Sequence, residues 1–310
     1  MTLYQMANSS YIKSIHKVVQ LLLVLPYFPG RDFLTENIPW LLLPKTRGPL
    51  TLSTVYGFDI NINPKSDKGV DSEIYLYGTY ELGTAHIIAA VLNKGDSFID
   101  VGANIGFFSL MASQLVSSSG KVYSFEPFPE SLELLNANIK LNNVENISVY
   151  DFALGAKSSE KRIYPEPENR GGSSFIKNKF NQVQGSELVK IKPLNDLAEI
   201  AHDTLIKAIK IDVEGWELEV LRGCSALLKS ENPPVLIVEY SSFSIQESEE
   251  RMELVGFIRG VGEYKIFKLR RGKGRISKLV LIQTDDQLPN HDNLFCFTEQ
   301  HIRSLPKILF

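Results

Sequence analysis

The sequence predicts an α/β fold built on a mostly parallel, Rossmann-like sheet. From residue 71 onward, short apolar segments typical of strands alternate with longer segments of helical periodicity. Such alternation indicates a parallel sheet with helices on both faces. A glycine-rich turn follows one predicted strand, and acidic residues recur where the strands end. Because ligands of such sheets bind at the carboxyl ends of the strands, these observations also place a ligand site there.

Five apolar segments bounded by turn residues are predicted to form the parallel strands. They are Ser97–Val101, Val122–Glu126, Ile147–Phe152, Ala208–Ile211 and Val235–Glu239. Pro129–Leu141 and Trp216–Leu228 carry apolar residues at the spacing of one helix face. Tyr264–Leu269 and Leu294–Thr298 are expected to close the sheet as an antiparallel pair. The segment Tyr164–Gln184, rich in Gly, Asn, Ser and Lys, is predicted to be a loop that could cover a substrate.

Residues 1–70 are predicted to form an N-terminal appendage to the domain of residues 71–310. The appendage is expected to hold one or two helices and a hairpin around Leu50–Ile62. The apolar run Val18–Leu25 is too short to span a bilayer, and Pro26 follows it instead of a cleavage site. We therefore interpret it as a packed helix, with peripheral membrane contact or a signal peptide as alternatives. A cap over the active site or a homodimer contact would explain the apolar character.

Composition narrows the partners and the compartment. The 310 residues carry a net charge of −3, which gives no general attraction to nucleic acid, and no nucleic-acid partner is expected. Cys224 and Cys296 are too few for a disulfide framework, so a cytoplasmic protein with free thiols is expected. The basic run Lys265–Lys278 contains Gly272 and Gly274 and is interpreted as a solvated hairpin turn, with a phosphate or nucleic-acid patch as the alternative.

The strongest local pattern is the sequence FIDVGANIGFFS at residues 98–109. Asp100 lies near the end of a strand, and the turn that follows contains Gly102 and Gly106. Glycine lets a nucleotide-like ligand approach the backbone because no Cβ intervenes. Glu126 ends the next strand, where a carboxylate can accept both hydroxyls of a ribose. The pattern predicts a site for an adenosine-containing cofactor.

The spacing of the glycines distinguishes between cofactors. In the dinucleotide motif G-x-G-x-x-G, the middle glycine lets the backbone approach a pyrophosphate, and the turn Gly102–Gly106 lacks that glycine. A turn of this kind beside an acid suits S-adenosylmethionine, which has no phosphate and carries a cationic amino group and a sulfonium. An NAD-dependent oxidoreductase is the less favoured alternative.

At this point the chain resembles the FkbM-type family of class I S-adenosylmethionine-dependent methyltransferases. The resemblance spans residues 80–240 and rests on FIDVGANIGFFS (98–109), FEPFP (125–129), DFALG (151–155), GGSSF (171–175), KIDVEGWELEVLRG (210–223) and VEY (238–240). It implies the class I sheet order, and O-methylation of a hydroxyl on a sugar, glycan or secondary metabolite. A small-molecule or glycan acceptor is therefore expected.

The cofactor site is predicted from these motifs. Asp100 is expected to orient the methionine amino group, and Asn104 either to bind the cofactor carboxylate or to stabilise the turn. By resemblance, Asp151 meets the adenine amino group, and Tyr80 and Glu81 line the pocket. The complete predicted set is Tyr80, Glu81, Asp100, Gly102, Ala103, Asn104, Gly106, Glu126, Pro127, Asp151 and Ala153.

Three further acids are the candidate catalytic residues. Asp212 is predicted to be the base that removes the proton of the acceptor hydroxyl, and Glu214 or Glu239 to hold a second hydroxyl. The same three acids could bind Mg²⁺, so a metal remains an alternative. An RNA or protein methyltransferase and a non-catalytic binding module also remain open as functions.

Overall fold

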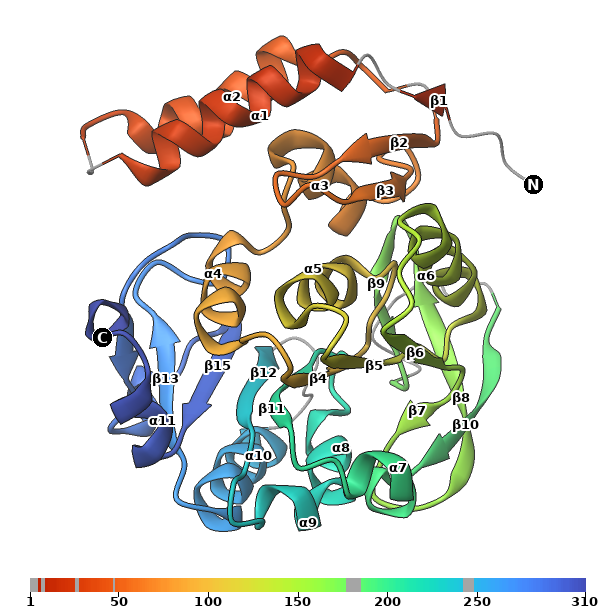
Figure 1. The fold of residues 1–310 in the computed structure, drawn as a ribbon, viewed down its shortest axis with the longest axis vertical. Helices are drawn as coiled ribbons and strands as arrows, with labels where there is room; N and C mark the ends of the chain where they lie inside the picture. Colours follow the sequence, from red (N-terminus) through yellow and green to blue (C-terminus); the bar gives the residue numbers. More distant parts are fainter. Residues whose placement is uncertain (1–4, 7–8, 26–27, 47, 177–184, 242–247) are drawn as a thin grey trace.

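An eight-stranded sheet forms the centre of the molecule (Figure 1). The computed structural model describes residues 5–6, 9–25, 28–46, 48–176, 185–241 and 248–310. The strands follow one another in the order β14 (Leu279–Leu281), β13 (Lys265–Leu269), β15 (His291–Phe297), β12 (Val235–Ser241), β11 (Ile206–Ile211), β4 (Ser97–Val101), β5 (Lys121–Phe125) and β6 (Ile147–Tyr150). The strands from β12 to β6 are parallel, whereas β15 runs antiparallel to both β12 and β13. The predicted fold class is confirmed.

Helices cover both faces of this sheet because its strands are apolar on both sides. On one face lie α4 (Leu82–Val91), α5 (Phe107–Val116), α6 (Pro129–Leu141) and α11 (Glu299–Ser304). On the other lie α7 (Ala198–Ala201), α8 (Glu217–Gly223), α9 (Ser225–Leu228) and α10 (Ser248–Val261). Within β4, Phe98 belongs to the first core, and Ile99 and Val101 to the second. The predicted helix Trp216–Leu228 is divided at Cys224, whose N–H is shared between the carbonyls of Val220 at 3.1 Å and Leu221 at 3.3 Å.

A second, four-stranded sheet is inserted between β6 and β11. Its order is β7 (Ala153–Leu154), β10 (Glu187–Lys192), β8 (Ser159–Glu166) and β9 (Asn169–Ser174). The predicted loop Tyr164–Gln184 is therefore wrong over β8 and β9, which pair as an antiparallel hairpin. Gly171, Gly172 and two serines give β9 the composition of a loop, which hides the strand. Residues 177–184 of the predicted loop lie outside the described residues.

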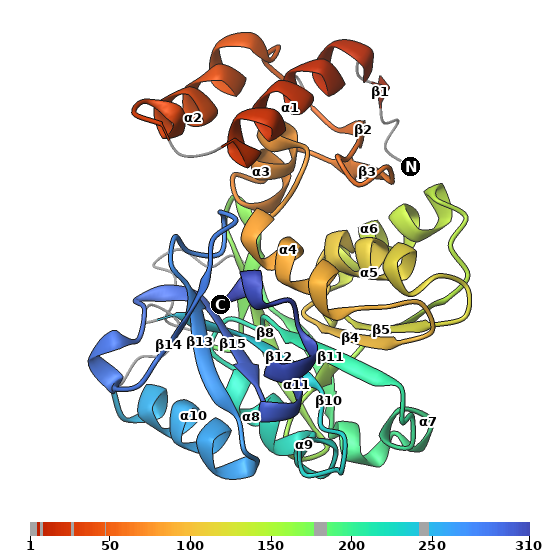
Figure 2. The ribbon, with the colours of Figure 1, turned by 60° about the vertical axis from the view of Figure 1, so that its left-hand side comes forward.

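The N-terminal segment lies at one end of the molecule, where its two helices form a layer above its hairpin and the helix that follows (Figures 1 and 2). Its elements are β1 (Gln5–Met6), α1 (Ser9–Val24), α2 (Arg31–Leu42), β2 (Leu50–Ser53) and β3 (Asp59–Ile62), followed by α3 (Val70–Tyr77). The predicted helices and hairpin are confirmed. The buried His16 of α1 lies 2.9 Å from the Tyr75 carbonyl of α3, which fixes the layer on the rest of the chain. The division of the domains at residue 70 stays a prediction.

Exposed apolar side chains are concentrated in this layer. Of the seventeen exposed large apolar side chains among the described residues, nine lie between residues 11 and 42. They are Tyr11, Val18, Leu21, Leu25, Phe33, Leu34, Trp40, Leu41 and Leu42. Within the described part of the chain, every helix is too short or too polar to span a bilayer. Membrane contact and homodimer formation through this surface stay predictions.

A buried charged cluster joins the N-terminal segment to the inserted sheet. The Arg170 guanidinium of β9 lies 3.3 Å from Asp71, 3.9 Å from Asp67 and 3.3 Å from Glu130. The backbone N–H of Arg170 also donates to the Asp67 carboxylate at 2.8 Å. Burial raises the pKa of Asp71 to about 6, although the charge of Arg170 opposes the shift. Three segments distant in sequence therefore depend on one cation.

Replacing Arg170 is expected to cost much more stability than replacing an exposed arginine. Arg170→Ala leaves two buried carboxyl groups without a counter-ion and should lower the free energy of unfolding by about 3 kcal/mol. Arg222→Ala removes ion pairs at a side chain that is 37% exposed and should cost less than about 1 kcal/mol. Urea unfolding followed by circular dichroism measures both. Equal losses would contradict the structural role of Arg170.

Candidate active site

The turn after β4 passes unusually close to the turn after β11. Gly102 has φ +80°, and a Cβ at this position would lie 1.9 Å from the Asp212 carbonyl oxygen. The Asp212 N–H in turn donates to the Val101 carbonyl at 3.0 Å. Only glycine allows both the backbone angle and the approach. The predicted glycine turn is therefore held against the strand end that carries the candidate base.

Glu126 lies buried beside this turn at the end of β5. One carboxyl oxygen accepts the Asn104 N–H at 2.7 Å, and the other accepts the Phe128 N–H at 2.9 Å. Burial raises the pKa of Glu126 to about 7, although both N–H groups oppose the shift. Each carboxylate oxygen can accept a second hydrogen bond, so the group can still receive two hydroxyls.

A small cavity opens next to Glu126, and we call it the smaller cavity. Its volume is about 40 Å³, enough for water but too little for a base. Predicted residues in its wall are Gly102, Asn104, Glu126, Pro127 and Ala153. Trp216 and Phe175 complete the wall with ring centroids 5.1 Å apart. The Trp216 indole N–H is buried and has no hydrogen-bond partner among the described residues, which makes it a candidate donor for a ligand.

A larger cavity of about 850 Å³ lies on the other side of the glycine turn. Gly102, Asn104 and Asp212 belong to the walls of both cavities, so the two meet at the turns after β4 and β11. The predicted residues that line the larger cavity are Tyr80, Glu81, Gly102, Ala103, Asn104, Asp212, Glu214 and Glu239. The structure thus brings the candidate catalytic acids together with most of the predicted cofactor residues.

The three candidate catalytic acids converge. Oxygens of Asp212, Glu214 and Glu239 lie within 4.8 Å of one another. Lys210 of β11 approaches Asp212 to 2.6 Å, and Lys273 of the β13–β14 turn lies 3.1 Å from Glu239. Two ammonium groups therefore balance the acids.

These charges divide the protonation states of the acids. Burial alone would raise the pKa of Asp212, but the charges of Lys210 and Lys273 hold it below its ordinary value. Burial and the negative charge of Asp212 raise the pKa of Glu239 well above its ordinary value. The two shifts run in opposite directions, so Asp212 is the stronger acid of the pair and Glu239 the weaker.

A magnesium ion at the acid cluster stays a prediction, and it would have to compete with two ammonium groups. Mg²⁺ requires carboxylate oxygens free to point at the ion. The ammonium groups of Lys210 and Lys273 already pair with Asp212 and Glu239, and so supply the positive charge that a metal would bring.

The backbone around the larger cavity is strained at three positions. Glu81, Asn104 and Glu214 have φ values of 42°, 49° and 52°, which residues other than glycine rarely adopt. Such angles cost free energy and cluster at functional sites. The buried Glu217 helps hold the turn around Glu214, because its carboxylate accepts hydrogen bonds from the backbone N–H groups of Val213 and Gly215.

Some predicted cofactor residues lie outside both cavity walls. Asp100 is buried and accepts the Ser109 hydroxyl at 2.6 Å, so it anchors α5 to β4. Gly106, with φ +90°, precedes the first residue of α5. Asp151 is exposed at a bend after β6. Their roles in cofactor binding stay predictions.

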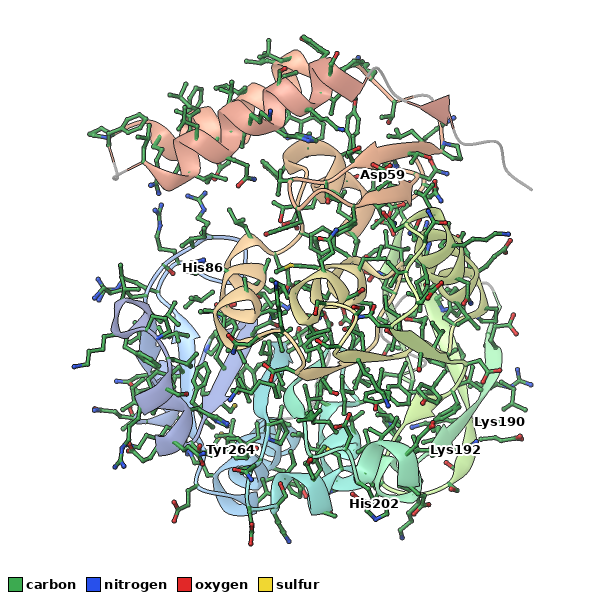
Figure 3. The ribbon with its side chains drawn as sticks, in the orientation of Figure 1. Asp59, His86, Lys190, Lys192, His202 and Tyr264 are labelled. Atoms are coloured by element: carbon green, nitrogen blue, oxygen red, sulfur yellow. The ribbon has the colours of Figure 1, made fainter. Side chains whose placement is uncertain are left out.

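Several residues of the site were not predicted. His291, at the start of β15, lines the larger cavity with its Nε2 atom 3.9 Å from Glu239. His86 on α4 and His202, which directly follows α7, lie on opposite sides of the sheet and outside both cavity walls (Figure 3). Trp216 stood within the KIDVEGWE motif but was given no role.

The basic run Lys265–Lys278 is not simply a solvated turn, as was predicted. The Lys273 ammonium group lies 3.1 Å from Glu239 and 2.8 Å from Glu81, and the Lys273 side chain is 18% exposed. Arg271 and Arg275 each lie 2.6 Å from Asp32 of α2. The partners come from residues far away in sequence, so no local pattern could reveal them.

Comparison with known proteins decides the family. Residues 100–264, more than half of the chain, match the model of the methyltransferase FkbM domain. The chain belongs to this family of methyltransferases. The predicted family is therefore confirmed, and with it methyltransferase activity.

The chain is also similar to individual members of known function or structure. It is 30% identical to Methyltransferase 1 of Beauveria bassiana over 54% of this chain and 72% of that protein. It is 28% identical to the hexuronic acid methyltransferase AglP of Haloferax volcanii over 48% of this chain and 60% of that protein. The crystal structure of an FkbM methyltransferase from Methylobacillus flagellatus KT aligns with 92% of this chain and 58% of that chain, at 14% identity and a TM-score of 0.42.

The close contact between the turns after β4 and β11 predicts that adding one methyl group at Gly102 destabilises the fold. Gly102→Ala forces the turns after β4 and β11 apart and should lower the free energy of unfolding by more than about 2 kcal/mol. Gly260→Ala, in α10 with nothing within 4 Å of the added Cβ, should change stability by no more than about 1 kcal/mol and in the favourable direction. Urea unfolding compares them. A Gly102→Ala protein as stable as the wild type would contradict the observed contact.

Proposed function

We propose that the protein transfers the methyl group of S-adenosylmethionine to a hydroxyl oxygen of a neutral sugar or glycan. The observation that carries the proposal is the meeting of two unlike cavities at Gly102, Asn104 and Asp212. The smaller cavity offers partners for an adenosine, and the larger offers acids for a hydroxylated acceptor. Membership of a methyltransferase family supports the reaction type.

The donor set of the smaller cavity suits adenosine. Glu126 would accept the two ribose hydroxyls, and the unpartnered Trp216 N–H would donate to a ring nitrogen of adenine. The cavity is too small for adenine as it stands, so its wall must move outward on binding. Phe175 and Gly171 of that wall belong to the inserted sheet or follow it directly, which keeps the proposal that this segment acts as a lid.

The larger cavity can orient a hydroxyl and take its proton. The bound donor supplies a methyl group on a sulfonium, which is open to direct displacement. As the acceptor oxygen attacks carbon, its proton becomes strongly acidic, so even a carboxylate of low pKa can accept it. Asp212, whose pKa is lowered by the two lysines, is our candidate for this base, whereas Glu239, whose raised pKa favours the protonated form, can donate a hydrogen bond to a neighbouring hydroxyl. Positioning of the acceptor supplies the rest of the rate enhancement.

The charges of the larger cavity favour a neutral acceptor. Among the residues that the structure describes, six carboxyl groups line it against three ammonium groups, those of Lys68, Lys210 and Lys273. The acids are Glu73, Glu81, Glu166, Asp212, Glu214 and Glu239. A hexuronate would bring a further negative charge into this excess, at a cost in a partly desolvated site. We therefore propose a different acceptor class from the one named for the Haloferax volcanii relative.

Calorimetric titration with S-adenosylhomocysteine, with NAD⁺ as control, tests the cofactor. We expect binding of S-adenosylhomocysteine alone, unchanged by Mg²⁺. Its affinity should fall by up to tenfold per pH unit below about 7, because Glu126 must be ionised to accept both hydroxyls. Glu126→Gln should bind more weakly and without this pH dependence. Binding of NAD⁺ instead would overturn the proposal.

Two further variants test the division of roles. Glu126→Ala should weaken S-adenosylhomocysteine binding at least tenfold, whereas Asp212→Asn should keep that affinity within threefold and lower methyl transfer at least a hundredfold. Transfer is measured with a methyl-labelled donor and a panel of neutral glycosides. An equal loss of cofactor affinity in both variants would contradict the roles assigned to the two acids.

A further inference from the structure

One face of α2 contacts the β13–β14 turn and ends at the larger cavity. Asp32, Glu36 and Trp40 are spaced four residues apart, so their side chains share one face of the helix. Asp32 pairs with Arg271 and Arg275, and Glu36 pairs with Arg275. These ion pairs hold that face against the β13–β14 turn.

The same turn reaches the acid cluster. Lys273 lies between Arg271 and Arg275 in sequence, and its ammonium group contacts Glu81 and Glu239. The Lys273 carbonyl also accepts the Gly83 N–H at 2.8 Å, which fixes the turn on α4. The turn therefore links α2 to the catalytic acids through short, directional contacts.

Trp40 lines the larger cavity although it is 69% exposed. An indole presents a flat apolar face and a polar edge. Leu76 and Tyr77 of α3 line the cavity as well, so apolar side chains accompany the acids in its wall. The cavity thus combines apolar faces with hydrogen-bonding groups.

A pyranose ring has matching chemistry. Its C–H groups form an apolar face, and its hydroxyls form a polar edge. We propose that Trp40 is the platform on which a neutral pyranose ring of the acceptor stacks, which presents a ring hydroxyl to Asp212 and Glu239. The inference rests on the proposed function and adds a residue outside the family domain, because Trp40 precedes the matched residues 100–264.

The neighbouring Leu41 provides a matched control. It is 80% exposed and belongs to the same apolar surface of the N-terminal layer, but it does not line the cavity. If that surface instead served contact with a membrane or a second copy of the chain, Leu41 would matter as much as Trp40. The two substitutions therefore separate the two explanations.

The test measures methyl transfer to neutral methyl hexopyranosides and to the matching hexuronates. Trp40→Ala should raise the acceptor KM at least tenfold, with kcat and S-adenosylhomocysteine affinity within twofold of wild type. Trp40→Phe should restore most of the loss, and Leu41→Ala should change nothing. An unchanged KM in Trp40→Ala, or equal effects of Trp40→Ala and Leu41→Ala, would overturn the platform.

A binding measurement separates this inference from the proposed function. Trp40 and Trp216 are the two tryptophans of the chain, so the fluorescence difference between wild type and Trp40→Phe reports Trp40. With S-adenosylhomocysteine bound, addition of hexopyranosides should change this difference signal. A change without any methyl transfer would support the platform and refute the reaction. Methyl transfer without a fluorescence change would refute the platform and support the reaction. If neither a fluorescence change nor methyl transfer is observed, both proposals are refuted.

Discussion

The acids of the larger cavity can share one site because two lysines lie among them. Like charges at such distances repel strongly in a partly desolvated cavity. Lys210 comes from the strand that carries Asp212, whereas Lys273 comes from the turn between β13 and β14 and joins Glu81 to Glu239. The contacts within the cluster therefore also connect three parts of the fold, which are the strand ends, the start of α4 and the C-terminal hairpin.

The segments outside the central sheet attach to this centre through charge. Arg271 and Arg275 connect α2 to the turn that carries Lys273, and Arg170 connects the inserted sheet to α3 and α6. The first connection places Trp40 in the wall of the larger cavity, and the second places the inserted sheet over the smaller one. The appendage and the insertion thus form the walls in which two substrates could meet, whereas the sheet supplies the floor.

Local sequence patterns were enough to predict the part of the site that the central sheet forms. The glycine turn, Glu126 and the acids after β11 and β12 lie within a few residues of predicted strand ends, so periodicity and spacing could place them. Lys273 and Trp40 could not be placed in this way, because their positions depend on contacts across more than 150 residues of sequence. The strand β9 was missed because its glycines and serines have low strand propensity, and the sheet contacts that stabilise it are not local.

The central claim is that the adenosine of the methyl donor binds in the smaller cavity and its sulfur faces the acid cluster. A crystal structure of the complex with S-adenosylhomocysteine tests this most directly. Both ribose hydroxyls should lie within hydrogen-bond distance of Glu126, with adenine beside Trp216 and the inserted sheet moved outward. The sulfur should face the larger cavity near Asp212. A ligand held wholly in the larger cavity, with Glu126 bonded only to Asn104 and Phe128, would contradict the account.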